Sequence, residues 1–248
     1  MPTAHKNDKR VGEVTLLAGG SAWRGRGADP ALAAALRMTD GHAPRVAYIG
    51  AANGDDAQFR RWGETVLRDA GAGEILNVAL MRGGSAAEVG QALERAQVVF
   101  MSGGDVEAGM SAINHRGVAP RLRAMHAAGI PFIGVSAGSI MLGSFWVRWK
   151  SPSDDSSAAP FDCLGLAPYI CDTHAEDEEW AEIKVLLRLL GAGHIGYALP
   201  SGCGIRVAAD GRVTPVGGPV WRMTWTDHGV CSEQCASPGS LNGKTRRA

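Results

Sequence analysis

The chain has 248 residues, in which 25 lysine or arginine residues are balanced by 25 aspartate or glutamate residues. This length suits one α/β domain with a complete hydrophobic core. The balanced charge creates no overall field to attract a polyanion, so we expect neither nucleic acid nor a membrane surface as a partner.

Apolar runs typical of strands alternate with segments typical of helices up to residue 144. The predicted strands are 13–18, 45–49, 75–80, 98–101 and 132–135, and the helices that follow them are 30–38, 57–70, 86–96, a stretch ending at 126, and 136–144. Such alternation predicts an α/β fold, a three-layer αβα sandwich with a mostly parallel central sheet. Ligands bind such sheets at the carboxyl ends of the strands, so we expect the chemistry in the loops there.

The pattern changes after residue 145. A polar loop is expected at 150–157, a helix at 176–190, and antiparallel strands at 204–208, 212–216 and 220–225. We expect these strands to extend the edge of the main sheet as an antiparallel C-terminal extension. The predicted domain spans 11–227, and 1–10 and 228–248 are expected to be mobile tails.

The sequence shows neither a membrane span nor a signal peptide. No stretch approaches ~20 uninterrupted apolar residues, and residues 1–10 are polar, so we expect a cytoplasmic protein without structural disulfides. The cysteines are at 163, 171, 203, 231 and 235. A zinc site of Cys231, Cys235 and His228 is an alternative, but no second ligand pair has a familiar spacing, so we expect no metal.

Three predicted strands end in small polar residues, at 18–21, 101–105 and 135–139. They are expected to meet at one rim. The first resembles the start of a phosphate loop, but it has neither the G-K-[ST] ending nor G-x-G-x-x-G spacing, so nucleotide binding is disfavoured and we expect no cofactor.

The third strand end reads F-I-G-V-S-A-G-S-I-M at 132–141, so Gly134 and Gly138 flank Ser136 as G-x-S-x-G. In a nucleophile elbow, the serine lies on a tight turn between a strand and a helix, and small neighbours let the substrate approach. The alternative is an ordinary serine that caps a helix. A catalytic interpretation therefore needs a base, an oxyanion site and a matching fold.

A base for the serine would be a histidine, because imidazole titrates close to neutrality. Among the seven histidines, His174 stands out because it ends the extended segment 165–174 and lies two residues after Asp172. On a strand these two side chains would face the same way. The alternative is a histidine at the start of a helix, stacked against Trp180.

Four motifs in series carry a resemblance to a known family. They are F-M-S-G-G-D at 100–105, G-V-S-A-G-S at 134–139, L-G-L-A-P at 164–168 with D-T-H at 172–174, and A-L-P-S-G at 198–202. In order and spacing they resemble the dipeptidase E and cyanophycinase family of serine peptidases, whose fold is similar to that of class I glutamine amidotransferases. The resemblance covers roughly residues 13 to 220.

The resemblance implies roles for four residues: Ser136 as nucleophile, His174 as base, and the backbone N–H groups of Gly104 and Ala137 as the oxyanion hole. Such donors stabilise the charge of the tetrahedral intermediate. The glycine-rich loop could also be a plain turn that ends a strand. Four further residues are expected to contact the substrate, namely Gly103, Asp105, Asp172 and Ser139.

The chain departs from the family pattern at the acid that orients the histidine. The family usually has a glutamate where this chain has Ser201. Ser201 at this catalytic position can accept a hydrogen bond from imidazole, but it cannot stabilise the imidazolium with a full charge. In a related triad, an acid-to-amide change costs about 10⁴ in turnover. Either another carboxylate replaces the acid, with Asp154, Asp155 and Asp172 as candidates, or activity is low or lost.

Two further departures concern the substrate. Val106 stands where cyanophycinase-like members tend to have glutamine, and 175–179 reads A-E-D-E-E where relatives that hold aspartyl groups tend to have arginine. A negative rim would repel an acidic substrate and attract a basic one. Alternatively, these carboxylates only offset a helix dipole.

The sequence therefore predicts a hydrolase of small peptides or isopeptides that acts through an acyl-enzyme on Ser136. The alternative is a weak or inactive family member that binds a peptide or a small metabolite. An amidotransferase would need a cysteine at the elbow, and Ser136 argues against it. A homodimer is left open.

Overall fold

The computed structural model describes residues 11–19, 29–37, 42–151 and 154–236. The expected tails 1–10 and 237–248 lie outside the described residues, as do Gly20 and Ser21 of the first rim motif. Among the described residues, no helix has both the length and the apolar character needed to cross a membrane.

The main sheet has, in the described part of the chain, the strand order β11-β10-β1-β5-β4-β2-β3. Strands β1, β5, β4, β2 and β3 are parallel, and β10 and β11 add an antiparallel edge next to β1. Their bounds are β1 Val14–Leu17, β2 Val46–Ile49, β3 Ile75–Val78, β4 Val98–Met101, β5 Phe132–Val135, β10 Gly204–Val207 and β11 Val213–Val216. Every residue of β1, β2, β4 and β5 is buried, which explains their continuous apolar runs.

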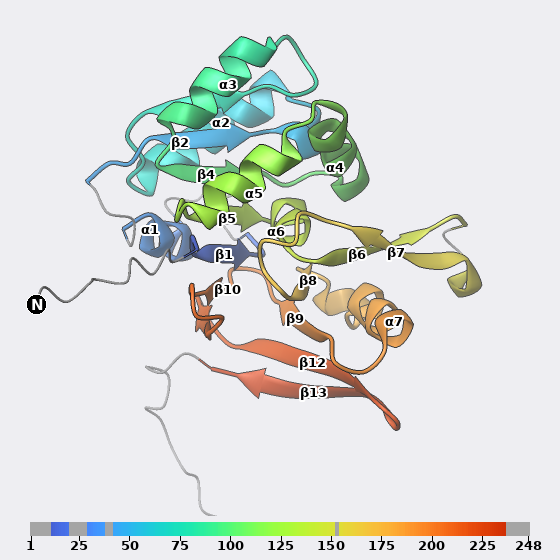
Figure 1. Cartoon of the computed structure of the whole chain (residues 1–248). Helices are drawn as coiled ribbons and strands as arrows, with labels where there is room; N and C mark the ends of the chain where they lie inside the picture. The colour runs from blue at the N-terminus through green and yellow to red at the C-terminus, as the bar shows by residue number, and fades with distance from the viewer. Residues whose placement is uncertain (1–10, 20–28, 38–41, 152–153, 237–248) are drawn as a thin grey trace, which may run out of the picture.

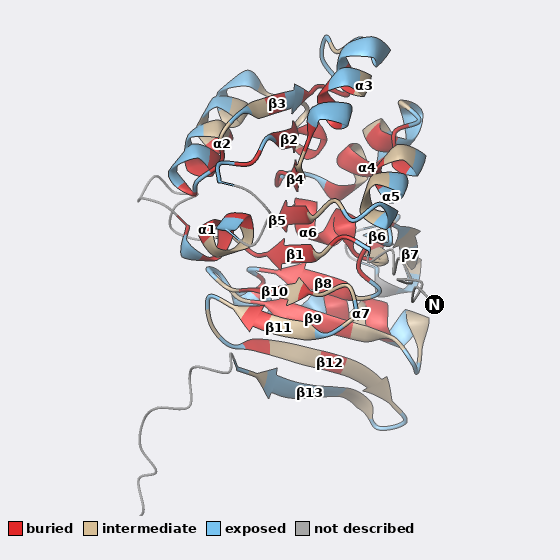
Figure 2. Cartoon of the chain, turned by 60° about the vertical axis from the view of Figure 1, so that its left-hand side comes forward, coloured by how far each residue is buried: buried red, intermediate tan, exposed pale blue. Residues whose placement is uncertain are grey.

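Helices cover both faces of this sheet (Figure 1). Helices α1 (Pro30–Arg37) and α2 (Ala57–Asp69) pack on one face, against side chains such as Leu17, Tyr48 and Phe100. The other face packs against four helices, which are α3 Ala86–Arg95, α4 Val106–His115, α5 Ala119–Ala127 and α6 Ala137–Leu142. Figure 2 shows the buried strands between partly exposed helices. The predicted three-layer α/β sandwich is confirmed.

A second sheet lies beside the main one and has the order β13-β12-β9-β8. Its strands are β8 Ile170–Thr173, β9 Ile195–Leu199, β12 Val220–Thr226 and β13 Gly229–Cys235. Helix α7 (Ala181–Leu190) packs on this sheet through Ile183 and Leu187, beside Met223 of β12. His174, one of the candidate site residues, directly follows β8 of this sheet.

Two predictions about the C-terminal part are wrong. Residues 220–225 pair with β9 in the second sheet and do not extend the main one. Residues 229–235 form strand β13, so 228–248 is not a tail throughout. Alternating side chains indicate a strand, but they do not say which partner offers free backbone groups. A further hairpin, of β6 (Phe145–Trp149) and β7 (Ala158–Asp162), flanks the predicted polar loop and was not expected.

The helix expected to start at residue 176 starts five residues later. A short 3-10 turn η4 occupies Glu176–Glu178, and Glu179 and Trp180 then have positive φ angles of 51° and 63°. Left-handed residues interrupt the helical hydrogen-bond ladder, so α7 begins only at Ala181. The acidic residues therefore lie in a tight turn that directly follows His174.

Candidate active site

Ser136 occupies a tight turn between β5 and α6. Its φ and ψ angles are 55° and −126°, an uncommon conformation for a residue with a side chain. The two flanking glycines are required by crowding: a Cβ on Gly134 would lie 2.6 Å from the backbone of Gly138, and one on Gly138 would lie 2.1 Å from the carbonyl oxygen of Met101. This geometry is that of a nucleophile elbow, in which backbone strain presents the serine hydroxyl.

The hydroxyl of Ser136 lies next to the imidazole of His174. Ser136 Oγ and His174 Nε2 are 2.7 Å apart, within hydrogen-bond distance. The histidine directly follows β8 of the second sheet, and its backbone N–H donates to the Leu199 carbonyl. Two sheets therefore bring together residues that are 38 positions apart in the sequence.

The glycine-rich loop after β4 lies against this serine. A Cβ on Gly103 would be 3.1 Å from Ser136 Cβ, so only a glycine brings the backbone this close without displacing the serine. Gly104 has φ 142°, and a Cβ there would lie 2.1 Å from the Ala52 carbonyl oxygen. Ala137 is the first residue of α6, and such N–H groups have no partner within their own helix. Ala137 directly follows the nucleophile and Gly104 follows the glycine that packs against it, and their role as oxyanion donors stays a prediction.

Asn53 supports this loop and was not identified from the sequence. It lies in the 3-10 turn η2 (Ala51–Asn53) after β2, and its Nδ2 donates to Ser102 Oγ at 2.7 Å and to the Gly103 carbonyl at 3.2 Å. The Asp105 N–H also donates to the Ala52 carbonyl, at 2.7 Å. Asn53 follows the predicted strand 45–49, and this position could have identified it as a candidate from the sequence.

Glu176 and Ser201 are in contact at the same end of the second sheet. The Ser201 N–H donates to Glu176 Oε1 at 2.6 Å. Partial burial opposes ionisation of Glu176, but hydrogen bonds from the backbone and side chain of Ser201 and the charge of His174 outweigh it, so the pKa of Glu176 is lowered. Sequence reasoning treated Glu176 only as part of an acidic stretch, although it is as close to His174 in sequence as Asp172.

Burial of Asp172 argues against the expected substrate contact, and among the described residues its carboxylate has no hydrogen bond to His174, for which it was a candidate partner. Its side chain is buried, and its Oδ1 accepts the Thr173 N–H at 2.8 Å. Burial, followed by repulsion from Glu182 of α7, raises the pKa of Asp172 to about 7. Asp172 thus lies close to Glu182 of α7, and its Oδ2 is buried with no hydrogen-bond partner among the described residues. His174 has a positive φ of 46°, so the strand alternation that would place both side chains on one face stops before it.

The other proposed replacement acids lie in the loop between β6 and β7. The carboxylate of Asp154 is exposed and is bound by the backbone and side chain of Ser156, at 2.9 and 2.6 Å. The carboxylate of Asp154 therefore stabilises the loop in which it lies. The side chain of Asp155 is outside the described residues.

The expected substrate contacts in the two rim loops differ in their surroundings. Asp105 is exposed and caps α4, because its Oδ1 accepts the Ala108 N–H at 2.7 Å. Its contact with a substrate, like that of Gly103, stays a prediction. Ser139 is fully buried, and its expected contact is wrong: its hydroxyl accepts the Leu17 N–H and donates to the Leu17 carbonyl, both at 2.8 Å.

Replacing Ser139 with alanine should therefore destabilise the fold without removing a substrate contact. The Leu17 N–H would lose its buried acceptor, which costs about 1–3 kcal/mol in the free energy of unfolding. Urea unfolding of Ser139→Ala beside the unchanged protein measures this difference. An unchanged unfolding midpoint would contradict the assigned structural role.

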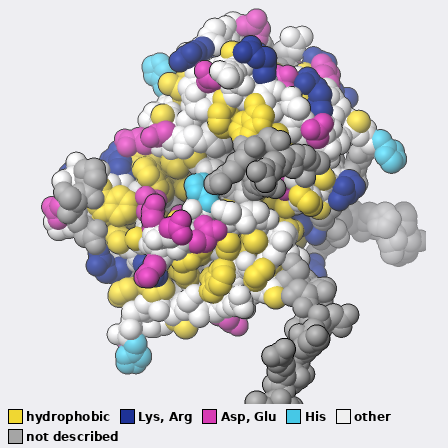
Figure 3. Space-filling model, turned by 180° about the vertical axis from the view of Figure 1, so that it is seen from behind, with side chains coloured by type: hydrophobic (Ala, Val, Ile, Leu, Met, Phe, Trp, Pro, Cys, Tyr) yellow, Lys and Arg dark blue, Asp and Glu magenta, His cyan; other side chains and the backbone are white. Residues whose placement is uncertain are grey.

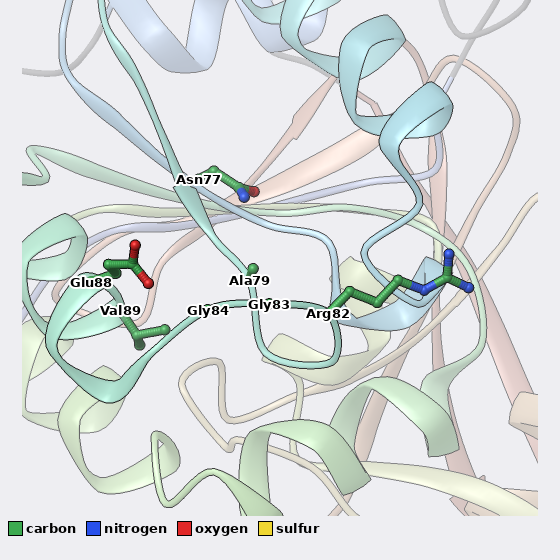
Figure 4. A pocket seen from close by; sticks show the side chains of 7 residues that line it. All are labelled: Asn77, Ala79, Arg82, Gly83, Gly84, Glu88 and Val89. Carbon is green, nitrogen blue, oxygen red and sulfur yellow. The ribbon is translucent and has the colours of Figure 1, made fainter.

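A pocket of about 360 Å³ lies elsewhere, beside β3 and the start of α3. In Figure 4, the side chains of Arg82 and Glu88 extend in different directions along its wall. The carboxylate of Glu88 accepts the Ser85 N–H at 2.8 Å as part of a helix cap, so it is already engaged. None of the predicted site residues lines this pocket.

The described residues contain no group of three or more histidine, cysteine, aspartate or glutamate side chains placed to hold a metal ion. The zinc alternative fails on geometry. Cys231 and Cys235 lie four residues apart on strand β13, which separates them by about 13 Å. Two ligands of one zinc ion cannot be so far apart.

The fold is similar to solved peptidase structures. One is a peptidase from an acI-B1 Actinobacterium, with a TM-score of 0.69 and 16% identity, in a match that covers 94% of this chain and 97% of that chain. Another is a putative peptidase E protein from Listeria monocytogenes EGD-e, with a TM-score of 0.61 and 14% identity, covering 83% of this chain and 98% of that chain. At such identities the likeness supports the fold alone. No curated protein matches the chain closely enough to add to this comparison.

The family is shown by the sequence match. The model of peptidase family S51 matches residues 15–214, which is most of the chain. The stretch includes Ser136, His174 and Ser201. The resemblance to dipeptidase E-like serine peptidases is thereby confirmed, and the chain belongs to peptidase family S51.

Proposed function

We propose that the protein is a serine hydrolase that cleaves a small peptide or isopeptide through an acyl-enzyme on Ser136. The observation that carries this proposal is the 2.7 Å distance between Ser136 Oγ and His174 Nε2, with the serine on a strained turn. Membership of family S51 supports a serine peptidase. Its cytoplasmic location and its state as a monomer or homodimer stay predictions.

In the proposed mechanism, Ser136 attacks the carbonyl carbon of the scissile bond while its proton passes to His174 Nε2. The negative charge on the former carbonyl oxygen is stabilised by the N–H groups of Gly104 and Ala137. The imidazolium then donates its proton to the leaving amine, and an acyl ester remains on the serine. Water, deprotonated by the same imidazole, hydrolyses this ester and regenerates the enzyme.

The experiment that tests this function is intact-mass measurement after treatment with a fluorophosphonate. We expect one label per chain in the unchanged protein and none in Ser136→Ala, because an activated serine hydroxyl displaces the fluoride. Ser111 is exposed on α4 and is not part of the candidate site, so Ser111→Ala is the serine control and should still be labelled. Folded protein that takes no label would contradict the proposal.

The charge around His174 favours a basic or neutral substrate. Residues 176–179 are four consecutive exposed carboxylates, and Figure 3 shows acidic side chains gathered beside a histidine on one face of the molecule. We expect kcat/KM for a dipeptide with a basic residue to exceed that for its acidic counterpart by at least tenfold at low salt. The ratio should fall with rising ionic strength, because salt screens exposed charges. An equal or inverted ratio in a dipeptide panel would contradict this prediction.

The second candidate is a weak or inactive protein that binds a peptide or a small metabolite at the same rim. The observation that favours it is Ser201, which stands where the family usually has an acid. Under this alternative, the unchanged protein would take no label, yet calorimetry with the dipeptide panel would detect binding. The labelling experiment therefore separates the two candidates.

A further inference from the structure

The candidate site lacks an acid at the expected position, and this raises the question of what orients its histidine. Nε2 of His174 faces Ser136, so only Nδ1 remains to be fixed by a partner. A neutral imidazole has to carry its proton on Nδ1 in order to accept from the serine at Nε2. A carboxylate near Nδ1 favours this tautomer and stabilises the imidazolium that forms.

We propose that Glu176 is the positioning residue that supplies this carboxylate, an inference that rests on the proposed function. Its Oε1 accepts the Ser201 N–H at 2.6 Å, which holds the carboxylate against the residue that stands where the family usually has its acid. His174 is tied to the same segment, because its N–H donates to the Leu199 carbonyl at 2.9 Å. The carboxylate of Glu176 and the backbone of His174 are thus both bound to the segment 199–201.

The turn between the two residues makes this arrangement feasible. His174 has a positive φ of 46°, and the 3-10 turn η4 starts at Glu176, so the chain reverses immediately after the histidine. This reversal lets a glutamate two residues after the histidine fold back toward its ring.

The electrostatics agree with this geometry. The pKa of Glu176 is lowered, and the charge of His174 is among the causes, after the hydrogen bonds of Ser201 have outweighed partial burial. Glu176 is therefore ionised at the pH values at which imidazole works as a base. Only an ionised carboxylate stabilises the imidazolium with a full charge.

Three other carboxylates have hydrogen bonds of their own. Asp172 is buried against α7, and Glu182 of that helix accepts the Trp146 Nε1–H at 3.0 Å. Asp154 is bound by Ser156. Glu176, by contrast, has its pKa lowered in part by the charge of His174.

The test compares fluorophosphonate labelling of Glu176→Gln and Asp177→Asn with that of the unchanged protein, over a range of pH. Both variants remove one charge from the same acidic stretch, so any general effect of that charge is shared. We expect labelling of Glu176→Gln to be at least 10²-fold slower than that of Asp177→Asn. Without the carboxylate, the midpoint of the rate against pH should also move about one unit lower, because the imidazolium is less stabilised.

The possible results separate the role of Glu176 from the proposed hydrolase function. If the unchanged protein is labelled, and Glu176→Gln reacts within threefold of Asp177→Asn with the same pH midpoint, the role of Glu176 is refuted while the proposed function stands. If the unchanged protein is not labelled, the proposed function fails first. A slow Glu176→Gln with an unchanged pH midpoint would show only a structural role and would also overturn the proposal. Circular dichroism and urea unfolding verify that the variants are folded.

Discussion

Replacing His174 with alanine should lower kcat for peptide hydrolysis by about 10⁴ to 10⁶-fold, with little change in KM. The imidazole is the group within hydrogen-bond distance of Ser136 Oγ, at 2.7 Å, and without it the hydroxyl has no base to take its proton. In another serine peptidase, loss of the histidine costs about as much as loss of the whole triad. The residual rate would come from the oxyanion donors and from substrate binding. Steady-state kinetics with a dipeptide cleaved by the unchanged protein measure this effect.

Two controls make this result specific to the imidazole. His228 is exposed in the turn between β12 and β13, so His228→Ala removes a histidine far along the second sheet and should keep full activity. Added imidazole should restore part of the activity of His174→Ala, since a free base can occupy the vacated space. Activity of His174→Ala within tenfold of the unchanged protein would show that another group is the base.

Replacing Asp172 with asparagine should stabilise the protein at pH 8 by up to about 4 kcal/mol, the free energy that corresponds to a rise of its pKa from 3.8 to about 7. The folded protein keeps a proton on Asp172 between these two pH values, whereas the unfolded chain has released it. The free energy of unfolding therefore falls as the pH rises from about 4 to 7, and the ionised, buried carboxylate remains a cost above that range. Asparagine resembles the neutral acid and avoids this cost.

The measurement is urea unfolding of Asp172→Asn and the unchanged protein between pH 4 and pH 8. The two proteins should be similar near pH 4 and diverge toward pH 8. Part of the slope should remain in the variant, because burial also raises the pKa of Glu182. Asp69→Asn, at the exposed end of α2, changes the same charge without removing a buried carboxylate and should leave the pH dependence intact. A stability difference that does not depend on pH would contradict the pKa argument.

Much of the site could be predicted because its signals are local. Part of the turn at Ser136 depends on contacts within a few residues, such as that between Gly134 and Gly138, so G-x-S-x-G indicates it, although Gly138 is also required by the distant Met101 carbonyl. The position of Asn53 after a strand would also have been readable, because the carboxyl ends of parallel strands share one edge of the sheet. The replacement acid could not be read in this way. Its contact with Ser201 joins residues 25 positions apart, and strand alternation pointed to Asp172.

The sequence by itself determined the α/β class, the order of the βα units and the candidate nucleophile, because periodicity and crowding act over short stretches of chain. Only the tertiary structure decided that β12 pairs with β9 in a second sheet, and that this sheet brings His174 to Ser136. It also decided that Asp172 lies close to Glu182 of α7 while Glu176 contacts Ser201. The physical reason is that strand partners and side-chain directions after a left-handed residue depend on packing between distant segments, which no local pattern encodes.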